Sequence, residues 1–139
     1  MAKVEAEKAK AEAPFFLAAK EALDESHKLE SAIGIGVTYQ KYNEQLIVFA
    51  TKVDNLNRAA RDTGFSHNQN AEKLCHELRE ARDDYHSAMG WWDAKNEHPD
   101  YADKYPSLYA EVENKLQSDW SDAAKDICEA DRLFRKLKE

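Results

Sequence analysis

Glycine and proline are scarce in this chain, and their positions divide it into four segments. Only 4 Gly and 3 Pro occur among the 139 residues, and both residue types interrupt regular helices. Between them, apolar residues recur at alternating intervals of three and four, which is the spacing of one face of an α-helix. The sequence therefore predicts an all-α fold.

The four apolar stripes also predict how the helices pack. In antiparallel helices joined by short loops, the numbers of residues at equal height add to a nearly constant total. Phe49 with Leu78 and Tyr85 with Trp120 follow this rule together with their neighbours. We predict an antiparallel up-down-up-down four-helix bundle with a short first helix, forming one domain over residues 14–139. The stripes are Phe15, Ala19, Ala22, Ser26, Leu29 and Ile33; Tyr39, Tyr42, Leu46, Phe49, Val53, Leu56 and Ala60; Ala71, Leu74, Leu78, Ala81, Tyr85, Ala88 and Trp92; and Val112, Leu116, Trp120, Ala123, Ile127, Ala130, Phe134 and Leu137.

The ends of the helices follow from capping residues and glycines. Gly34 and Gly36 allow a reversal between the first two helices; the alternative is one helix kinked there, which would give three long helices. Residues 1–13 alternate Ala with Lys and Glu, and we predict a flexible or frayed N-terminal tail. The predicted first-turn or capping residues are Pro14, Thr38, Ser66 and Ser107.

Composition limits the partners. The net charge is −7 and the two signs are interleaved, which argues against a nucleic-acid partner. The longest apolar runs, such as residues 46–50, are far shorter than the roughly 18 residues that suggest a membrane span. Residues 1–13 contain no apolar signal region, so either the protein is cytoplasmic or an export signal has been removed.

One short segment carries a family resemblance. Residues 36–42 read Gly-Val-Thr-Tyr-Gln-Lys-Tyr, which resembles a Gly-Val-x-Tyr-x-x-Tyr segment of small exported bacterial helical proteins of unknown function. The resemblance covers about residues 29–53, and Lys41 stands where an acidic residue is common. It implies an all-helical fold, a bacterial source, and a periplasmic or secreted location with the signal removed. It provides no catalytic residues.

The two cysteines share one height in the predicted bundle. Cys75 and Cys128 lie beside the stripes of the third and fourth helices. The numbering rule places them at nearly the same level along the bundle axis. A disulfide is possible if both lie on facing flanks, because bridged Cα atoms are only about 4.4–6.8 Å apart. The alternative is two free thiols.

Two Asp-x-x-His pairs raise the question of a metal. Asp24 with His27 and Asp83 with His86 have the i, i+3 spacing of the Glu-x-x-His pairs in di-iron bundles. The acids here are Asp, and the stripes lack the additional core glutamates. We therefore predict solvated side chains, with no metal and no cofactor.

Aromatic side chains gather around the connection between the last two helices. They form the best candidate binding surface, because paired aromatics with a polar rim are typical of interfaces and ligand clefts. The alternative is a small core that holds this loop in place. The candidate residues are Trp91, Trp92, His98, Tyr101, Tyr105 and Tyr109. A polar group at the end of the second helix, Asn55, Asn57, Arg58, Arg61 and Asp62, is interpreted as a solvated helix terminus.

No catalytic motif is recognisable, so the sequence favours a non-enzymatic bundle. We expect a cell-envelope protein that binds an unknown protein or small ligand. The alternatives are a metal-binding or redox bundle, and a cytosolic adaptor or chaperone-like dimer.

Overall fold

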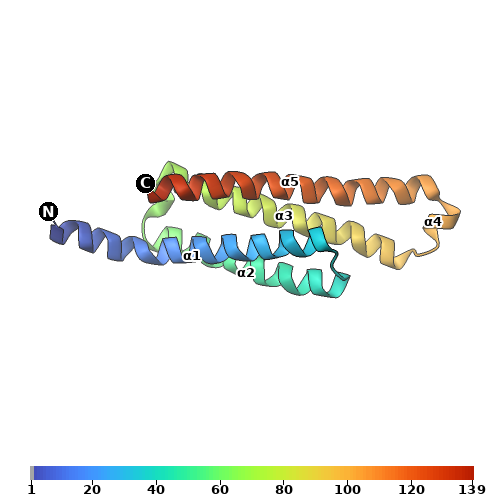
Figure 1. Ribbon diagram of the computed structural model, residues 1–139, viewed down its shortest axis with the longest axis horizontal. Coiled ribbons are helices and arrows are strands. Elements are labelled where there is room, and N and C mark those ends of the chain that lie inside the picture. The colour runs from blue at the N-terminus through green and yellow to red at the C-terminus, as the bar shows by residue number, and fades with distance from the viewer. Residues whose placement is uncertain (1) are drawn as a thin grey trace.

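The computed structural model describes the backbone of residues 2–139 and the side chains of residues 13–139. Four long helices run in alternating directions and form the predicted antiparallel bundle (Figure 1). No strand occurs in the described chain. The elements are α1 (Ala2–Ile35), α2 (Tyr39–Asp62), the 3-10 turn η1 (Phe65–His67), α3 (Gln69–Glu97), the single turn α4 (Tyr101–Lys104) and α5 (Pro106–Lys138).

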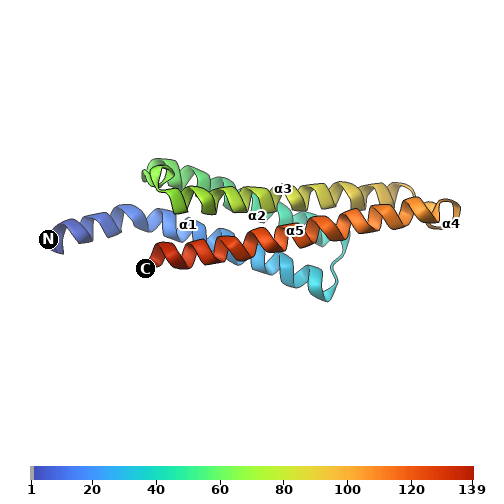
Figure 2. The same cartoon turned by 90° about the horizontal axis from the view of Figure 1, so that it is seen from above.

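The helices are offset along the bundle axis. At one end α1 begins beyond the others, and at the opposite end α3 and α5 continue past α1 and α2 and are joined through α4 (Figures 1 and 2). The last buried residues toward that second end are Ala88 and Leu116. We call residues 89–115 the hairpin tip; its start still contacts α2, where Trp92 meets Tyr39 and Tyr42, and beyond that point α3 and α5 pack against each other.

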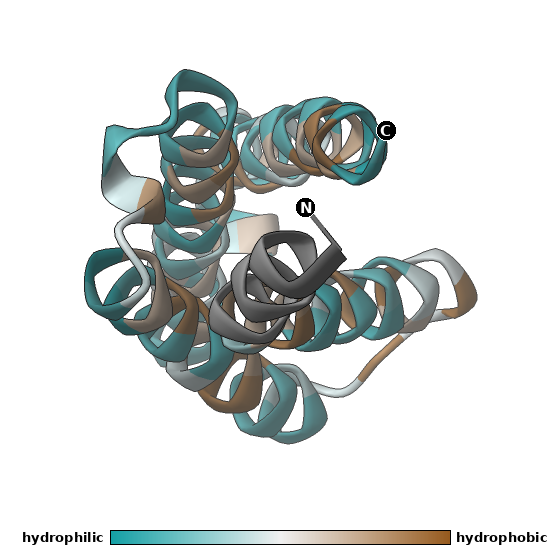
Figure 3. Cartoon of the chain, turned by 90° about the vertical axis from the view of Figure 1, so that its left-hand side faces the viewer, coloured by the Kyte–Doolittle hydropathy of each residue, from teal (hydrophilic) through white to brown (hydrophobic). Residues whose placement is uncertain are grey.

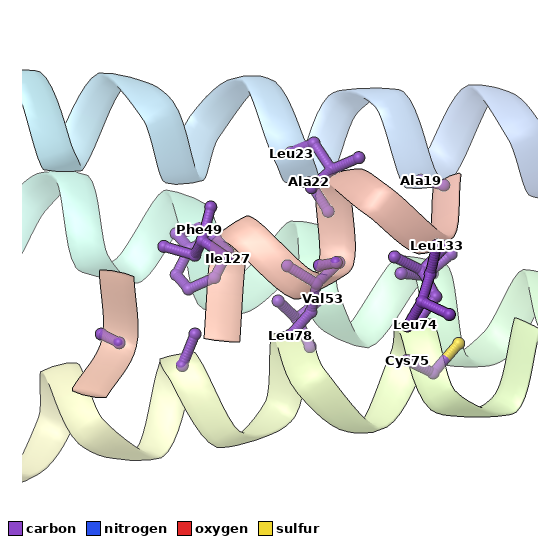
Figure 4. Packing of buried hydrophobic residues seen from close by; sticks show 14 of the residues in the cluster. Ala19, Ala22, Leu23, Phe49, Val53, Leu74, Cys75, Leu78, Ile127 and Leu133 are labelled. Atoms are coloured by element: carbon purple, nitrogen blue, oxygen red, sulfur yellow. The ribbon is translucent and has the colours of Figure 1, made fainter. Parts of the chain in front are cut away.

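The core lies where all four helices overlap. Hydrophilic residues cover the outer sides of the helices, and apolar residues lie mainly where the helices face one another (Figure 3). Figure 4 shows Phe49 of α2 beside Ile127 of α5, and further along the core Val53 of α2 close to Leu78 of α3, with Ala22 of α1 above these two. The predicted stripes are confirmed as the source of the core. None of the described helices is long and apolar enough to cross a bilayer.

Four core residues lie outside the predicted stripes: Leu23, Phe65, Cys75 and Leu133. Leu133 of α5 is buried beside the stripe residue Ala130, because the buried face of this helix is wider than one line of side chains. Phe65 of η1 is also buried, and its ring stacks on Phe15 with centroids 4.4 Å apart and planes 5° apart. The turn between α2 and α3 therefore closes one end of the core.

The chain reverses completely between α1 and α2. Gly36 has φ +110°, a left-handed conformation that favours glycine, and its N–H donates to Ala32 O at 2.9 Å. Thr38 then caps α2 as predicted, with Oγ1 accepting from Lys41 N at 3.2 Å. The alternative of one kinked helix in place of α1 and α2 is wrong.

Three local predictions need correction. The first helix is not short, because α1 continues through Pro14; the good helix formers Ala, Lys and Glu before Pro14 favour this continuation. Asn68, not Ser66, caps α3, since its side chain accepts from both Asn70 N and Ala71 N. At α5, Pro106 occupies the first helical position, and Ser107 lies inside the helix. As to the predicted tail, the backbone from Ala2 onward is helical, and the side chains of residues 1–12 lie outside the described residues.

Candidate functional site

A pocket of about 200 Å³ opens in the hairpin tip. It lies between the last turns of α3, the α4 turn and the first turns of α5. The helical spacing explains the lining, because Ala94 with His98 and Leu108 with Val112 are each four residues apart on one side of the chain. The lining residues are Ala94, Lys95, His98, Tyr101, Leu108, Tyr109 and Val112.

Aromatic rings form one wall of this tip pocket. The His98 and Tyr101 rings are stacked, with centroids 4.3 Å apart and planes 7° apart, and Tyr105 meets Tyr101 edge-on at 5.3 Å. Leu108 is 43% exposed at the mouth. Apolar surface that solvent can reach beside ordered rings is typical of a binding pocket.

Lys95 is the cation that lines the pocket, and it is already neutralised. Its Nζ lies 2.7 Å from Glu113 Oε2 and 5.2 Å from the centroid of the Tyr109 ring. Burial opposes its charge, but the hydrogen bond and the negative charge of Glu113, together with Tyr109, outweigh burial and raise the pKa of Lys95. Lys95 therefore holds α3 and α5 together and offers little charge to an anion.

The hairpin tip as a whole is acidic. Its 27 residues carry six carboxylates and three lysines, a net charge of −3. Lys104 is paired with Asp100, and Lys115 lies over the Trp91 ring. The carboxylates are Asp93, Glu97, Asp100, Asp103, Glu111 and Glu113. An incoming cation therefore meets a favourable potential.

The structure separates the predicted aromatic group into two sets. His98, Tyr101 and Tyr109 line the tip pocket, whereas Trp91 and Tyr105 lie outside its lining. Trp92 turns toward the bundle and packs against Tyr39, Tyr42 and Trp120, with centroids 5.5–6.0 Å apart. Sequence reasoning missed Lys95 and Leu108, although their spacing from His98 and Val112 indicates the same face.

The possible disulfide is absent. Cys75 is a buried free thiol and Cys128 is an exposed one. Cys75 lines a pocket between α2 and α3, whereas Cys128 lies on the solvent side of α5. The two residues lie in different surroundings, so the possible bridge is not formed and the alternative of two free thiols holds.

The Asp-x-x-His pairs do not converge. His27 joins α1 to α5 through Nε2, which lies 2.9 Å from Asp131 Oδ2, while Asp24 pairs with Lys20. Asp83 faces Arg82, and His86 is exposed. Across residues 13–139, no group of three or more His, Cys, Asp or Glu side chains is arranged to hold a metal ion.

An acidic pair between α3 and α5 was not anticipated from the sequence. The Asp84 side chain lies in a partly buried cluster with Asp126, Asp122 and Asp119. Burial, a hydrogen bond with Asp126 and repulsion from these carboxylates together raise the pKa of Asp84 to about 7. Burial also raises the pKa of Asp126. The pair therefore shares a proton at and below neutral pH, and its two carboxylates repel each other once both are ionised at higher pH.

This pair predicts a pH-dependent stability. The Asp84 pKa is higher in the folded protein than in the unfolded chain, so the folded state binds more protons between about pH 4 and pH 7, and stability falls as pH rises through that window. Asp84→Asn is expected to stabilise the protein at pH 8 by about 1 kcal/mol after allowance for solvent screening, or roughly 3 °C in Tm. At pH 4 the variant and the parent should differ little. Thermal unfolding at both values measures the difference.

Asp83→Asn is the matched control, because the neighbouring Asp83 is exposed and faces Arg82. It should not stabilise the protein at pH 8. An Asp84→Asn protein that melts below the parent at pH 8 would show that the carboxylate is held favourably in its ionised form.

None of the known protein families, curated proteins or solved structures compared with this chain matches it. The functional argument therefore rests on the geometry of the chain itself.

Proposed function

We propose that this protein is a non-enzymatic binding protein whose tip pocket takes an aromatic ring that carries a positive charge. The observation that carries the proposal is the aromatic-walled pocket in an acidic hairpin tip. The ligand is either a free aromatic amine or an aromatic side chain in a basic segment of a partner protein. Both present an aromatic ring next to a positive charge.

The size and the aromatic walls of the tip pocket support the proposal of an aromatic ligand. An apolar cavity of about 150 Å³ holds one benzene molecule, and the tip pocket measures about 200 Å³. The stacked His98 and Tyr101 rings offer a flat surface against which another ring can pack. Because α3 and α5 project beyond the other helices, a partner reaches this end without crossing the bundle (Figure 1).

The charges of the hairpin tip support the proposal that the ligand is positively charged. Lys95 already contacts Glu113, so the pocket has no free ammonium group among its lining residues to attract an anion. Glu97 flanks the lining residue His98 and is exposed, and Glu111 lies beside Val112. A ligand ammonium group at the mouth would therefore face carboxylates.

Three ligands with one ring system and different charges test the proposal. We expect tryptamine to bind with a Kd on the order of 0.1–1 mM, and indole and indole-3-acetate to bind successively more weakly, each by about fivefold. Ligand-observed and amide chemical-shift titrations by NMR measure all three affinities. Equal binding of indole-3-acetate and tryptamine would remove the charge preference from the proposal.

Variants of the tip locate the binding. Tyr101→Ala should weaken tryptamine binding about fivefold or more, because it removes the ring stacked on His98. Trp91→Ala is the control, since Trp91 is an aromatic residue of the same tip that does not line the pocket. If both variants lose the same affinity, the pocket is not the site. A Lys-Trp-Lys peptide that binds more tightly than tryptamine would identify a protein partner as the source of the ring.

We also propose a location in the bacterial cell envelope, on the basis of the resemblance at residues 36–42. The residues encoded ahead of Ala2 in the native gene test this location. A basic segment followed by an apolar stretch and a cleavage site supports export. A cytosolic adaptor is favoured if the native protein is recovered with the cytoplasmic fraction.

A further inference from the structure

A second pocket lies at the other end of α3, far from the hairpin tip. It measures about 180 Å³ and is enclosed by the end of α2, the η1 turn and the start of α3. In Figure 1 this turn lies at the end of the bundle opposite α4. We call it the arginine pocket; its lining residues are Asn57, Ala60, Arg61, Ser66, Glu72, Cys75 and Arg79.

Two guanidinium groups of the arginine pocket have no carboxylate partner among the side chains that the structure describes. Arg79 is partly buried, and its Nη1 donates to the neutral Asn57 Oδ1 at 2.8 Å. Within residues 13–139, neither Arg79 nor Arg61 lies within ion-pair distance of an acid, whereas Arg82 contacts both Asp54 and Asp83. A partly buried guanidinium without an anion keeps unused donors, because it has five N–H groups in a fixed fork.

The remaining polar groups suit an anion. Ser66 of the η1 turn offers a hydroxyl donor. Glu72 is the one carboxylate in the lining; it is exposed, and two arginines outnumber it. The lining therefore carries a net positive charge in a protein whose total is −7.

We propose that the arginine pocket binds a small oxyanion, a phosphate or carboxylate group, held by the guanidinium forks of Arg61 and Arg79. Arginine matches both groups because its paired N–H donors fit two oxygens at once. This site is independent of the tip pocket, since no residue lines both.

Cys75 provides a reporter inside the site. Its side chain is 3% exposed, and burial raises the pKa of the thiol to about 11, so it is neutral at pH 7 and does not repel an anion. A bound anion would cover the thiol. Alkylation of Cys75 should then slow as the anion concentration rises.

The experiment uses the full chain with Cys128→Ser, so that the exposed thiol is removed. Iodoacetamide labelling of Cys75 is followed by mass spectrometry at constant ionic strength, with sodium chloride replaced by phosphate or by acetate. We expect a saturable decrease in labelling rate and a parallel rise in Tm. If phosphate has the larger effect, the ligand carries a phosphate group. If acetate has an equal or larger effect, the ligand carries a carboxylate. If neither anion has a saturable effect, the proposal is overturned.

Arginine variants separate the site from general charge effects. Arg61→Ala should weaken anion protection of Cys75 about tenfold, because one charge-assisted fork is lost. Arg58→Ala is the control, since Arg58 lies one turn earlier on α2, is exposed and does not line the pocket. Equal losses in the two variants overturn the proposal. Arg79→Gln should abolish anion protection of Cys75. If this variant does not fold, the comparison of Arg61→Ala with Arg58→Ala still tests the proposal, because Arg61 is exposed.

Discussion

Phe49→Ala is expected to lower the free energy of unfolding by about 3–5 kcal/mol, the range for removing a fully buried phenyl ring. Phe49 is 0% exposed, and its ring meets Tyr85 edge-on at 5.9 Å. In Figure 4 the ring lies beside Ile127 of α5, within the buried core. Because small domains have only about 5–15 kcal/mol of stability in total, Tm should fall by roughly 10–20 °C. Urea unfolding followed by circular dichroism measures the loss.

Ile47→Ala is the matched control for this cavity. Ile47 lies two residues earlier on the same helix, is 65% exposed and is also a large apolar side chain. Its loss should change stability by no more than about 0.5 kcal/mol. Equal costs at the two positions would mean that α2 turns a different face toward the core.

Helical periodicity predicted the core because burial follows one face of each helix. Five of the six stripe residues of α1 and six of the seven in α2 are buried. The alternating directions of the helices were also predicted, since short connections make neighbouring helices antiparallel. These two regularities depend only on the 3.6-residue repeat and on loop length, which a sequence displays directly.

The sequence predicted less well in which direction around the helix axis a given side chain points. Cys75 and Cys128 were predicted at one height, yet only Cys75 is buried and the two are not bridged. The stripes did separate the neighbours Trp91 and Trp92, because consecutive residues point about 100° apart and only Trp92 lies on a stripe. Residues on the flank of a stripe, such as the cysteines, are harder to place. Which flank faces a neighbouring helix depends on how the helices are rotated, and the stripes do not determine that within one residue.

The arginine pocket was hidden for a different reason. Arg61 belonged to a polar group interpreted as a solvated helix terminus, and nothing local linked it to Arg79, which lies 18 positions later on α3. The two residues line one pocket because the η1 turn reverses the chain and Phe65 fixes that turn against Phe15. A site assembled across a turn needs the packing of that turn, which periodicity does not report.

Tyr42→Phe is expected to cost about 1–3 kcal/mol, although it removes a single oxygen atom. Tyr42 is fully buried, and its hydroxyl donates to Tyr85 O at 2.8 Å while accepting from Trp120 Nε1 at 3.2 Å. Burial raises the pKa of Tyr42, so the hydroxyl keeps its proton and can serve as the donor. The variant leaves the partly buried indole N–H without its partner in the bundle, and chemical denaturation measures the cost.

A double-mutant cycle with Trp120→Phe separates the hydrogen bond from the loss of packing. Trp120→Phe alone removes the indole donor and also some contact with Trp92, whose centroid lies 6.0 Å away. If the bond between Trp120 and Tyr42 stabilises the fold, the double variant should be less destabilised than the two single variants added together, by at least about 0.5 kcal/mol. Strict additivity would mean that water replaces Tyr42 at the indole N–H. In that case α2 and α5 would be held together at this height by ring packing alone.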